Sequence, residues 1–241
     1  MKRLLQVLRF AVLLPVDLAR MVLVYLPGHS GILLRRHYYR RRLRRCGENF
    51  CVMPGVHLSG LDWIEVGDNV MIRENAIIRT GAPNRGADER RCIRIVPTNR
   101  DCTPGIVVLS DNSRIAFGAL ILGQGGVHVG RDCGIGPGAV VLSETFHYQG
   151  SNADVVYKYS QGAAAEEQSL IQGAVVLEDG SGIASHVVLL PGARLRRQAW
   201  AGPGSIVRMG GLVAEGVIVR GDPAVPVFRR KGPASADPPA E

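Results

Sequence analysis

Between Ile171 and Val219, an aliphatic or small apolar residue recurs at every sixth position without interruption. The members of this series are Ile171, Leu177, Ile183, Leu189, Leu195, Ala201, Val207, Val213 and Val219. A helix would space its apolar residues about 3.6 positions apart and a free strand two apart, so a period of six fits neither alone. It fits a coil of three short strands joined by turns, in which each coil covers the next. The repeat therefore predicts an all-β solenoid, a left-handed parallel β-helix of hexapeptide repeats.

A second small or β-branched residue stands four positions after each of the first eight members of the series. Large side chains at every layer would overpack the narrow interior of such a prism, which makes Ala201 acceptable in the series. The same register returns upstream in two blocks, each with one eight-residue step. The residues predicted to point inward there are Val52, Leu58, Val66, Ile72, Ile78, Leu109, Ile115, Ile121, Val129, Ile135 and Val141.

These blocks divide the chain into three parts. Residues 1–48 are expected to form a helical, basic N-terminal extension, and residues 49–231 the left-handed parallel β-helix. Residues 232–241 are expected to form a disordered tail. Two insertions, near 82–105 and 147–170, interrupt the repeat. Insertions in a solenoid emerge as loops on one face, which is commonly the face that binds ligands.

The segment from Met1 to Tyr25 is strongly apolar, but its polar side chains fall near one helical stripe and Pro15 interrupts it. These polar residues are Lys2, Gln6, Arg9, Asp17 and Arg20. The segment is too charged and too broken to predict a membrane span, and it lacks the clean apolar core and cleavage site of a signal peptide. A second helix is expected from Ser30 to Arg45, with Ser30 as its N-cap.

Arginines crowd this second helix, with Tyr38 and Tyr39 among them. They are Arg35, Arg36, Arg40, Arg41, Arg42, Arg44 and Arg45. In one interpretation, residues 1–45 lie on a membrane surface that carries anionic lipid. In the other, they form a cap over the open edge of the first coil, and the two roles are compatible. No nucleic-acid-binding motif accompanies the basic residues, so nucleic acid is not expected as a partner.

The five cysteines are odd in number and include no C-x-x-C pair: Cys46, Cys51, Cys92, Cys102 and Cys133. This pattern favours reduced thiols in a cytosolic protein, and Cys133 occupies the small inward position of its repeat. Together with the basic residues 1–45, called the front end below, this cysteine pattern predicts a cytoplasmic protein held peripherally at the inner face of the cytoplasmic membrane.

His147 is the histidine best placed for chemistry, because it stands where the coil ending at Phe146 gives way to the second insertion. A neutral imidazole at such a junction can accept a proton from an incoming hydroxyl near neutral pH. The alternative is an ordinary loop histidine. For His57 and His128, which lie beside inward positions, a structural role is expected.

Three runs in the last third of the chain carry a family resemblance. The run Gly182–Ala193 resembles the W-I-G-(S/A)-(N/H)-V-x-I-x-P-G-V run of hexapeptide-repeat acyltransferases of the galactoside and maltose O-acetyltransferase type. Gly202–Val207 is similar to their G-A-G-S-V-V, and Gly221–Ala224 to their G-x-P-A ending. The resemblance covers about Val52 to Arg230. With its basic helical front end, the layout most resembles members that acetylate sugars of bacterial surface polysaccharides.

The resemblance implies a homotrimer with acetyl-CoA in the cleft between adjacent prisms, and no metal. It implies that His147 removes the proton of an acceptor hydroxyl, so that the oxygen attacks the thioester. Either Glu144 or Asp154 would orient the imidazole.

The resemblance also implies where the donor is held. Ser185 matches a residue near the thioester, and the backbone of Gly202 and Pro203 matches the wall along the pantetheine arm. The CoA phosphates would be held by cations matching Arg208, Arg229 and Arg230, a role that suits guanidinium groups. The alternative for these arginines is a solvated basic tail.

The sequence departs from the family pattern at three positions. Gly182 replaces the usual tryptophan, Ala184 the second glycine, and Pro203 an alanine whose N–H a proline cannot supply. The missing tryptophan leaves room, by this pattern, for a longer or different acyl group.

The function expected from these features is transfer of acetyl from acetyl-CoA to a sugar hydroxyl in cell-envelope polysaccharide or lipid-linked glycan synthesis. Two alternatives stay open: a noncatalytic trimeric β-helix that assembles or binds, and an acyltransferase for another small hydroxyl or amine acceptor. Zinc carbonic anhydrases resemble this fold, but they bind zinc through several histidines, usually including two that are five positions apart. No two histidines of this sequence are five positions apart, so a zinc carbonic anhydrase is not expected.

Overall fold

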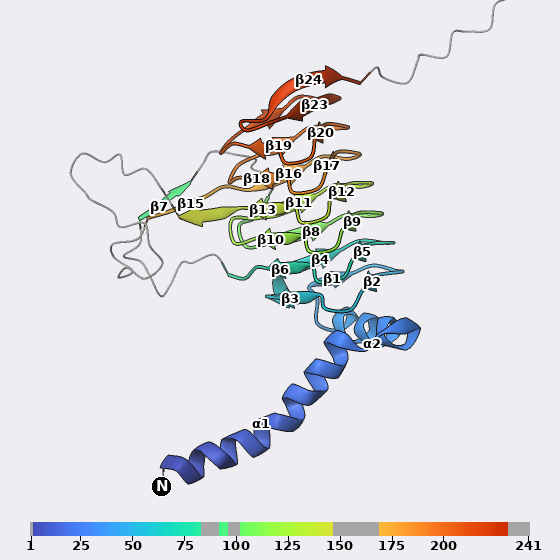
Figure 1. The fold of residues 1–241 in the computed structure, drawn as a ribbon, viewed down its shortest axis with the longest axis vertical. Coiled ribbons are helices and arrows are strands. Elements are labelled where there is room, and N and C mark those ends of the chain that lie inside the picture. Colours follow the sequence, from blue (N-terminus) through green and yellow to red (C-terminus); the bar gives the residue numbers. More distant parts are fainter. Residues whose placement is uncertain (1, 83–91, 96–101, 147–168, 231–241) are drawn as a thin grey trace, which may run out of the picture.

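The computed structural model of the chain describes residues 2–82, 92–95, 102–146 and 169–230. Strands of two to five residues follow one another around a prism with three sides, and each side is a sheet whose neighbouring prism strands run parallel (Figure 1). The expected fold class, a left-handed parallel β-helix with an N-terminal α-helical extension, is confirmed.

The three sheets are named A, B and C in the order in which the chain visits them. Sheet A contains β1 (Arg45–Cys46), β4 (Ile64–Val66), β8 (Val107–Leu109), β11 (Val127–Val129), β16 (Val175–Leu177), β19 (Arg194–Leu195) and β22 (Leu212–Val213). Sheet B contains β2 (Cys51–Val52), β5 (Met71–Ile72), β9 (Arg114–Ile115), β12 (Gly134–Ile135), β17 (Gly182–Ile183), β20 (Trp200–Ala201), β23 (Val217–Arg220) and the antiparallel β24 (Val225–Arg229). Sheet C contains β3 (His57–Ser59), β6 (Ile77–Arg79), β10 (Leu120–Leu122), β13 (Val140–Leu142), β18 (Val188–Leu189) and β21 (Ile206–Val207).

The period-six residues fill the prism, as predicted. From Leu177 to Val219, every member of the series is at most 4% exposed and belongs to one continuous core. Ile171 differs, because it is buried in a separate small sheet and lies outside that core. The six-residue spacing continues into that sheet, but the prism resumes only at β16.

Side chains at the corner between sheets A and B stack as the coils do. Asn49, Asn69, Asn112 and Asp132 all have φ between 53° and 58°, a left-handed conformation that Asn and Asp adopt more readily than most residues. Each asparagine donates from its Nδ2 to the Oδ1 of the next residue in this column, at 3.0, 3.2 and 2.9 Å. The turns therefore reinforce the stacking that the core begins.

The helix α1 (Lys2–Tyr25) leads away from the prism, at the end opposite to β24 (Figure 1). The expectation that Pro15 interrupts this segment is wrong, because the helix continues through it. A proline removes one backbone hydrogen bond and bends a helix, but good helix formers on both sides can carry the helix across it. Among the described residues, no helix combines the length and the apolar character needed to cross a bilayer.

The helix α2 (Gly28–Arg40) begins two residues before the expected N-cap. Pro27 takes the N-cap position and makes no side-chain capping bond, while Ser30 lies inside the first turn. The N-cap prediction is therefore wrong. The preceding proline has an extended backbone that already sets the entry angle, so no side-chain cap marks the start.

Arg35 joins the two helices to the first coil. Its side chain is fully buried, and its Nε donates to the carbonyl of Val52 in β2 at 2.8 Å. Its Nη1 donates to the carbonyls of Leu26 at 2.8 Å and Leu23 at 3.2 Å, at the C-terminal end of α1. One of the seven clustered arginines thus serves the fold, which supports the capping role of the front end.

Candidate functional site

Both insertions leave the prism at the same corner. The first follows β6 in sheet C and returns at β8 in sheet A, and the second runs from β13 to β16 between the same two sheets. The described parts of the insertions meet in a three-stranded sheet, named sheet D. In it β15 (Ser169–Gln172) pairs antiparallel with β14 (Glu144–Phe146) and parallel with β7 (Cys92–Ile95). Insertions far apart in sequence therefore build one structure at this corner, the insertion corner (Figure 1).

Buried polar contacts fix the chain where the second insertion departs. Ser143 is fully buried, its hydroxyl donates to the carbonyl of Leu122 at 2.7 Å, and it accepts from the Gly125 N–H at 2.9 Å. On β14, the Glu144 carboxylate accepts a hydrogen bond from the Gln172 amide, which is almost completely buried. Because a buried polar group is costly unless paired, these contacts set the strand that ends at Phe146.

His147 and Asp154 lie outside the described residues. Glu144 lies inside them, on β14, and its described partner is Gln172. A carboxylate has about four acceptor sites, so the bond from Gln172 leaves Glu144 able to accept another. The roles of His147 and Glu144 stay predictions.

Ser185, Gly202 and Pro203 come together at the corner between sheets B and C. The Gly204 N–H donates to the Ser185 carbonyl at 3.0 Å, so the two turns stack on adjoining coils. Gly202 is buried and Pro203 is exposed. Gly204 has a φ of 67°, and proline followed by such a glycine suits a tight turn. Turn chemistry therefore accounts for Pro203, which replaces the family's alanine.

Trp200 fills the space expected to be empty at Gly182. The two residues are paired across β17 and β20, and a Cβ atom built on Gly182 would lie 2.3 Å from Cζ3 of Trp200. The indole thus covers the glycine from the next coil. The expectation of extra room at this position is wrong, because the sequence pattern shows which residue is missing but not which neighbour replaces it.

The three candidate phosphate-binding arginines occupy two places. Arg208 follows β21 and is exposed at the corner between sheets C and A, in the column of turns from which the insertions leave. Arg229 ends β24, and Arg230 places its guanidinium carbon 5.7 Å from the centre of the Trp200 ring. The Arg230 N–H donates to the Gly216 carbonyl, at the corner between sheets A and B. Within one chain, Arg208 is therefore separate from Arg229 and Arg230.

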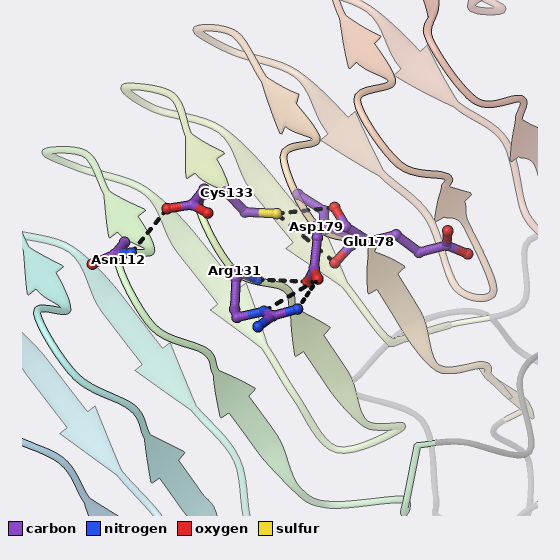
Figure 2. Close-up of polar contacts among 7 residues, drawn as sticks. Asn112, Arg131, Cys133, Glu178 and Asp179 are labelled. Atoms are coloured by element: carbon purple, nitrogen blue, oxygen red, sulfur yellow. Dashed lines mark hydrogen bonds and ion pairs between the residues drawn. The ribbon is translucent and has the colours of Figure 1, made fainter.

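The outer face of sheet A has two adjoining hollows, each of about 340 Å³, that share His128 and Asp179 in their linings. Arg131 and Asp179 form an ion pair there, with Nη2 3.0 Å from Oδ2, and the Arg131 N–H donates to Oδ1 at 2.9 Å (Figure 2). The backbone hydrogen bond from Arg131, together with its guanidinium, lowers the pKa of Asp179. Glu178 accepts from Nε of Arg194 at 2.7 Å.

Cys133 is buried beside this face and points toward the interior, as predicted (Figure 2). Its Sγ lies 3.1 Å from the carbonyl oxygen of Glu178 and 3.6 Å from Oγ of Ser181. Burial raises the pKa of this thiol, which disfavours the reactive thiolate.

Two histidines given structural roles differ in their surroundings. His57 is exposed on β3, and its ring meets the Tyr25 ring edge to face at 6.4 Å between centres, which is a capping contact. His128 is half-buried at the centre of β11 and lines both hollows of sheet A. The sequence carried the signal for His128, since it stands between the inward Val127 and Val129 and must point outward. Among the described residues, no group of three His, Cys, Asp or Glu side chains is arranged to hold a metal ion.

Comparison with known proteins gives structural matches only. No protein-family model matches the sequence. No curated protein matches it either.

Among solved structures, AntD, an N-acyltransferase from Bacillus cereus, in a complex with dTDP and coenzyme A, matches with a TM-score of 0.64 at 16% sequence identity. The match covers 82% of this chain and 89% of AntD. A second AntD complex, with dTDP-4-amino-4,6-dideoxyglucose and coenzyme A, gives the same score and identity over 82% of this chain and 90% of AntD. The hexapeptide-repeat acetyltransferase VCA0836 from Vibrio cholerae matches with a TM-score of 0.49 at 18% identity, over 83% and 82% of the two chains. The AntD likeness establishes a shared fold.

Proposed function

We propose that this protein is an acyltransferase that moves the acetyl group of acetyl-CoA to a hydroxyl of a sugar in cell-envelope glycan synthesis. The observation that carries the proposal is the insertion corner, where two insertions pair in sheet D and hold the chain up to Phe146, next to the candidate base His147. The shared fold with AntD and the hexapeptide runs around Ser185 and Gly202 support the same reaction class.

In the proposed reaction, His147 accepts the proton of the acceptor hydroxyl while the hydroxyl oxygen attacks the thioester carbonyl carbon. The tetrahedral intermediate collapses, the carbon–sulfur bond breaks, and CoA leaves as a thiolate that takes up the proton from His147. Glu144, through its place on β14, is the positioning residue for the imidazole. No metal or redox cofactor takes part in these proposed reaction steps.

The donor is proposed to lie along sheet C, between Ser185 and Pro203 at one edge and Arg208 at the other. Arg229 and Arg230 lie at a different corner, and they would reach the same CoA phosphates only from a neighbouring subunit. This distribution fits the expected homotrimer, in which each donor lies in the cleft between two prisms. Guanidinium groups suit phosphate because they offer paired donors.

An amine acceptor is the second candidate. AntD is an N-acyltransferase whose crystal structure holds an amino sugar linked to dTDP, and its fold is shared over most of both chains. An amine and a hydroxyl differ in how much they need a base, since an unprotonated amine attacks a thioester unaided more readily than a hydroxyl does. Dependence on His147 thus discriminates between the two acceptors.

The proposal is tested by the release of CoA thiol from acetyl-CoA in the presence of two matched sets of acceptors. One set is nucleotide- and lipid-linked sugars with free hydroxyls, and the other is the corresponding 4-amino sugars. Release with the first set supports O-acetylation, and release with the second alone corrects it to N-acetylation. No release with either set, and no binding of CoA by calorimetry, would support the noncatalytic assembly instead.

The proposed localisation is the inner face of the cytoplasmic membrane, where a lipid-linked sugar acceptor would be found. The basic front end supports this localisation, because anionic lipid attracts clustered arginines.

A further inference from the structure

The helices at the front of the chain expose more large apolar side chains than the rest of the described surface. Seven such residues between positions 13 and 25 of α1 are 41–55% exposed, and two on α2 are 41% and 50% exposed. They are Leu13, Leu14, Val16, Leu18, Met21, Val22, Tyr25, Leu33 and Leu34. Single exposed apolar residues need no explanation, but a contiguous group of this kind marks an interaction surface.

On α1, four of the seven exposed apolar residues form a stripe. Leu14, Leu18, Met21 and Tyr25 follow one another at intervals of three or four, which places them on one face of the helix. Leu23, on the opposite side of the helix, is buried. Leu14 and Leu18 on this stripe therefore lie on the face opposite to Leu23, while Met21 and Tyr25, at its C-terminal end, also line a hollow beside His57 of β3.

On α2, the outer face combines apolar and basic groups. Leu33 and Leu34 line a shallow surface hollow together with Arg36, His37 and Arg40. The opposite face is buried and carries Arg35 and Tyr39. Apolar side chains flanked by arginines are the pattern of a helix that lies in the interface of a bilayer.

The structure divides the clustered arginines by their surroundings. Arg35 is buried, Arg44 pairs with Glu65 at 2.9 Å, and Arg42 lies over the Tyr38 ring at 4.6 Å. Arg40 and Arg41 are exposed, and neither has an acidic partner among the described residues. Arg40 and Arg41 therefore place positive charge without an acidic partner beside the apolar face of α2.

Charge is distributed unevenly along the chain. Eleven of the 29 Lys and Arg residues, but only one of the 21 Asp and Glu residues, fall within the first 47 positions. The rest of the chain therefore carries 18 basic and 20 acidic residues. The partner that this front end attracts is anionic, while the rest of the chain, with two more acidic than basic residues, has no net attraction for the same partner.

We infer that the exposed face of α1 and α2 docks on an anionic lipid bilayer, with Leu14, Leu18, Met21, Leu33 and Leu34 in the apolar layer and Arg36, Arg40 and Arg41 at the phosphate level. The inference rests on the proposed work at a membrane and assigns the surface for it. Sheet C rises from β3, beside α1, through β6 and β10 to β13, which is three strand spacings or about 14 Å. The insertion corner then stands above the headgroups, within reach of a sugar on a lipid carrier.

The test measures co-flotation of the full chain with vesicles of 30% phosphatidylglycerol in phosphatidylcholine, and with vesicles of phosphatidylcholine alone. The wild type is expected to bind the anionic vesicles at low salt and to lose binding as salt screens the charges. Arg40→Gln with Arg41→Gln is expected to weaken binding about 30-fold, since each arginine near such a surface contributes about a fivefold factor. Leu18→Gln with Met21→Gln is expected to weaken it at least tenfold.

Matched controls lie on the prism. Arg114→Gln with Arg196→Gln removes two exposed arginines, and Phe228→Gln removes a side chain that is 61% exposed at the other end of the molecule. Binding by these controls equal to wild type supports the assignment. Equal binding of the wild type to both kinds of vesicle, or losses in the controls as large as in the front-end variants, would overturn it.

Light scattering at the same protein concentration decides whether a second copy covers the apolar face. If Leu18→Gln with Met21→Gln reduces the size of the assembly and the wild type does not float with vesicles, the surface is an interface between chains and the inference is wrong. Thiol release from acetyl-CoA with a soluble acceptor is measured in parallel on the wild type. Its failure would count against the proposed function and leave the lipid assignment standing.

Discussion

The prism and the helix α1 are built from similar aliphatic side chains, but the prism buries them whereas α1 exposes most of those described. In the prism, inward residues such as Ile183, Leu189 and Leu195 are at most 1% exposed. On α1, Leu14, Leu18 and their neighbours are 41–55% exposed. A coil of the prism has a coil above and below it, whereas the outer face of α1 has no neighbour among the described residues.

This difference shows that period, rather than composition, decides what an apolar residue does here. A period of six lets each side chain meet its equivalent one coil away, so that stability is shared between nearest neighbours. A stripe at helical spacing needs a partner surface from elsewhere. The coils of the prism therefore bury one another's apolar side chains, whereas the apolar stripe of the front end needs a partner surface to bury its side chains.

The largest expected effect is the contrast between two substitutions to aspartate. Ile183→Asp buries an unpaired carboxylate at a position that is 1% exposed, and we expect it to prevent folding. Leu18→Asp places the same group where the side chain is 48% exposed, and we expect no loss of thermal stability. Circular dichroism melting measures both. Equal damage by the two variants would abolish the distinction between prism and front end.

A smaller effect is expected at the joint between the two regions. Arg35→Met keeps the apolar stem but removes the donors to the carbonyls of Leu23, Leu26 and Val52, at a cost of about 3 kcal/mol. Hydrogen exchange is expected to show lost protection at the end of α1 with protection of the prism kept. Arg36→Met is the control, because Arg36 is only half-buried. If the Arg35 variant lost hydrogen-exchange protection equally in α1 and in the prism, the two regions would unfold as one unit and the distinction between them would be wrong.

Within the prism, Gly182→Ala is expected to cost about 1–3 kcal/mol, because the new methyl group meets the Trp200 ring. Gly134→Ala, one coil earlier in the same sheet, places its methyl group in open space and is expected to cost little. In a Trp200→Leu background, most of the cost at Gly182 should vanish. Chemical denaturation of the four variants measures this coupling, and equal costs at Gly134 and Gly182 would rule out the role assigned to Trp200.

The smallest effect concerns two exposed ion pairs. Because the pKa of Asp179 is lowered in the folded state, its pairing with Arg131 stabilises the fold above the unfolded pKa and is lost as pH falls through the folded pKa. Asp179→Asn is thus expected to lower the Tm by about 1 °C at pH 7, and this loss is expected to shrink as pH falls through the folded pKa of Asp179. Asp17→Asn on α1, whose pair with Arg20 is 3.6 Å long and exposed, is expected to change nothing. A larger fall in Tm for Asp17→Asn than for Asp179→Asn would contradict the expectation that the prism contributes more to stability than α1.

The interior of the prism could be predicted because it is a local, periodic property of the sequence. The same residues that repeat at six are those the structure buries, and Cys133 was placed correctly for that reason. The joint between insertions could not be predicted, since the pairing of β7 with β15 links segments that share no period. Ile171 was misplaced by the same periodicity, because its spacing fits the series while its strand partners lie in sheet D.

At the front end and the site, the errors come from contacts that spacing does not encode. Pro15 was expected to interrupt a helix that continues, and Arg35 was counted with surface charges although the fold buries it. The gap predicted at Gly182 is filled by Trp200, which is one coil away in space but eighteen positions away in sequence. Each of these depends on which residues become neighbours after folding.

The rate of acetyl transfer by His147→Ala and by His186→Ala tests the assigned chemistry most directly. We expect His147→Ala to lower kcat by about 10²- to 10⁴-fold with little change in the KM for acetyl-CoA, as for loss of a general base. We expect a nearly unchanged rate for His186→Ala, because that exposed side chain lies over Gly138 in a turn of the scaffold. A His147 variant that keeps more than about a tenth of the wild-type kcat would contradict the assignment of the chemistry to the insertion corner.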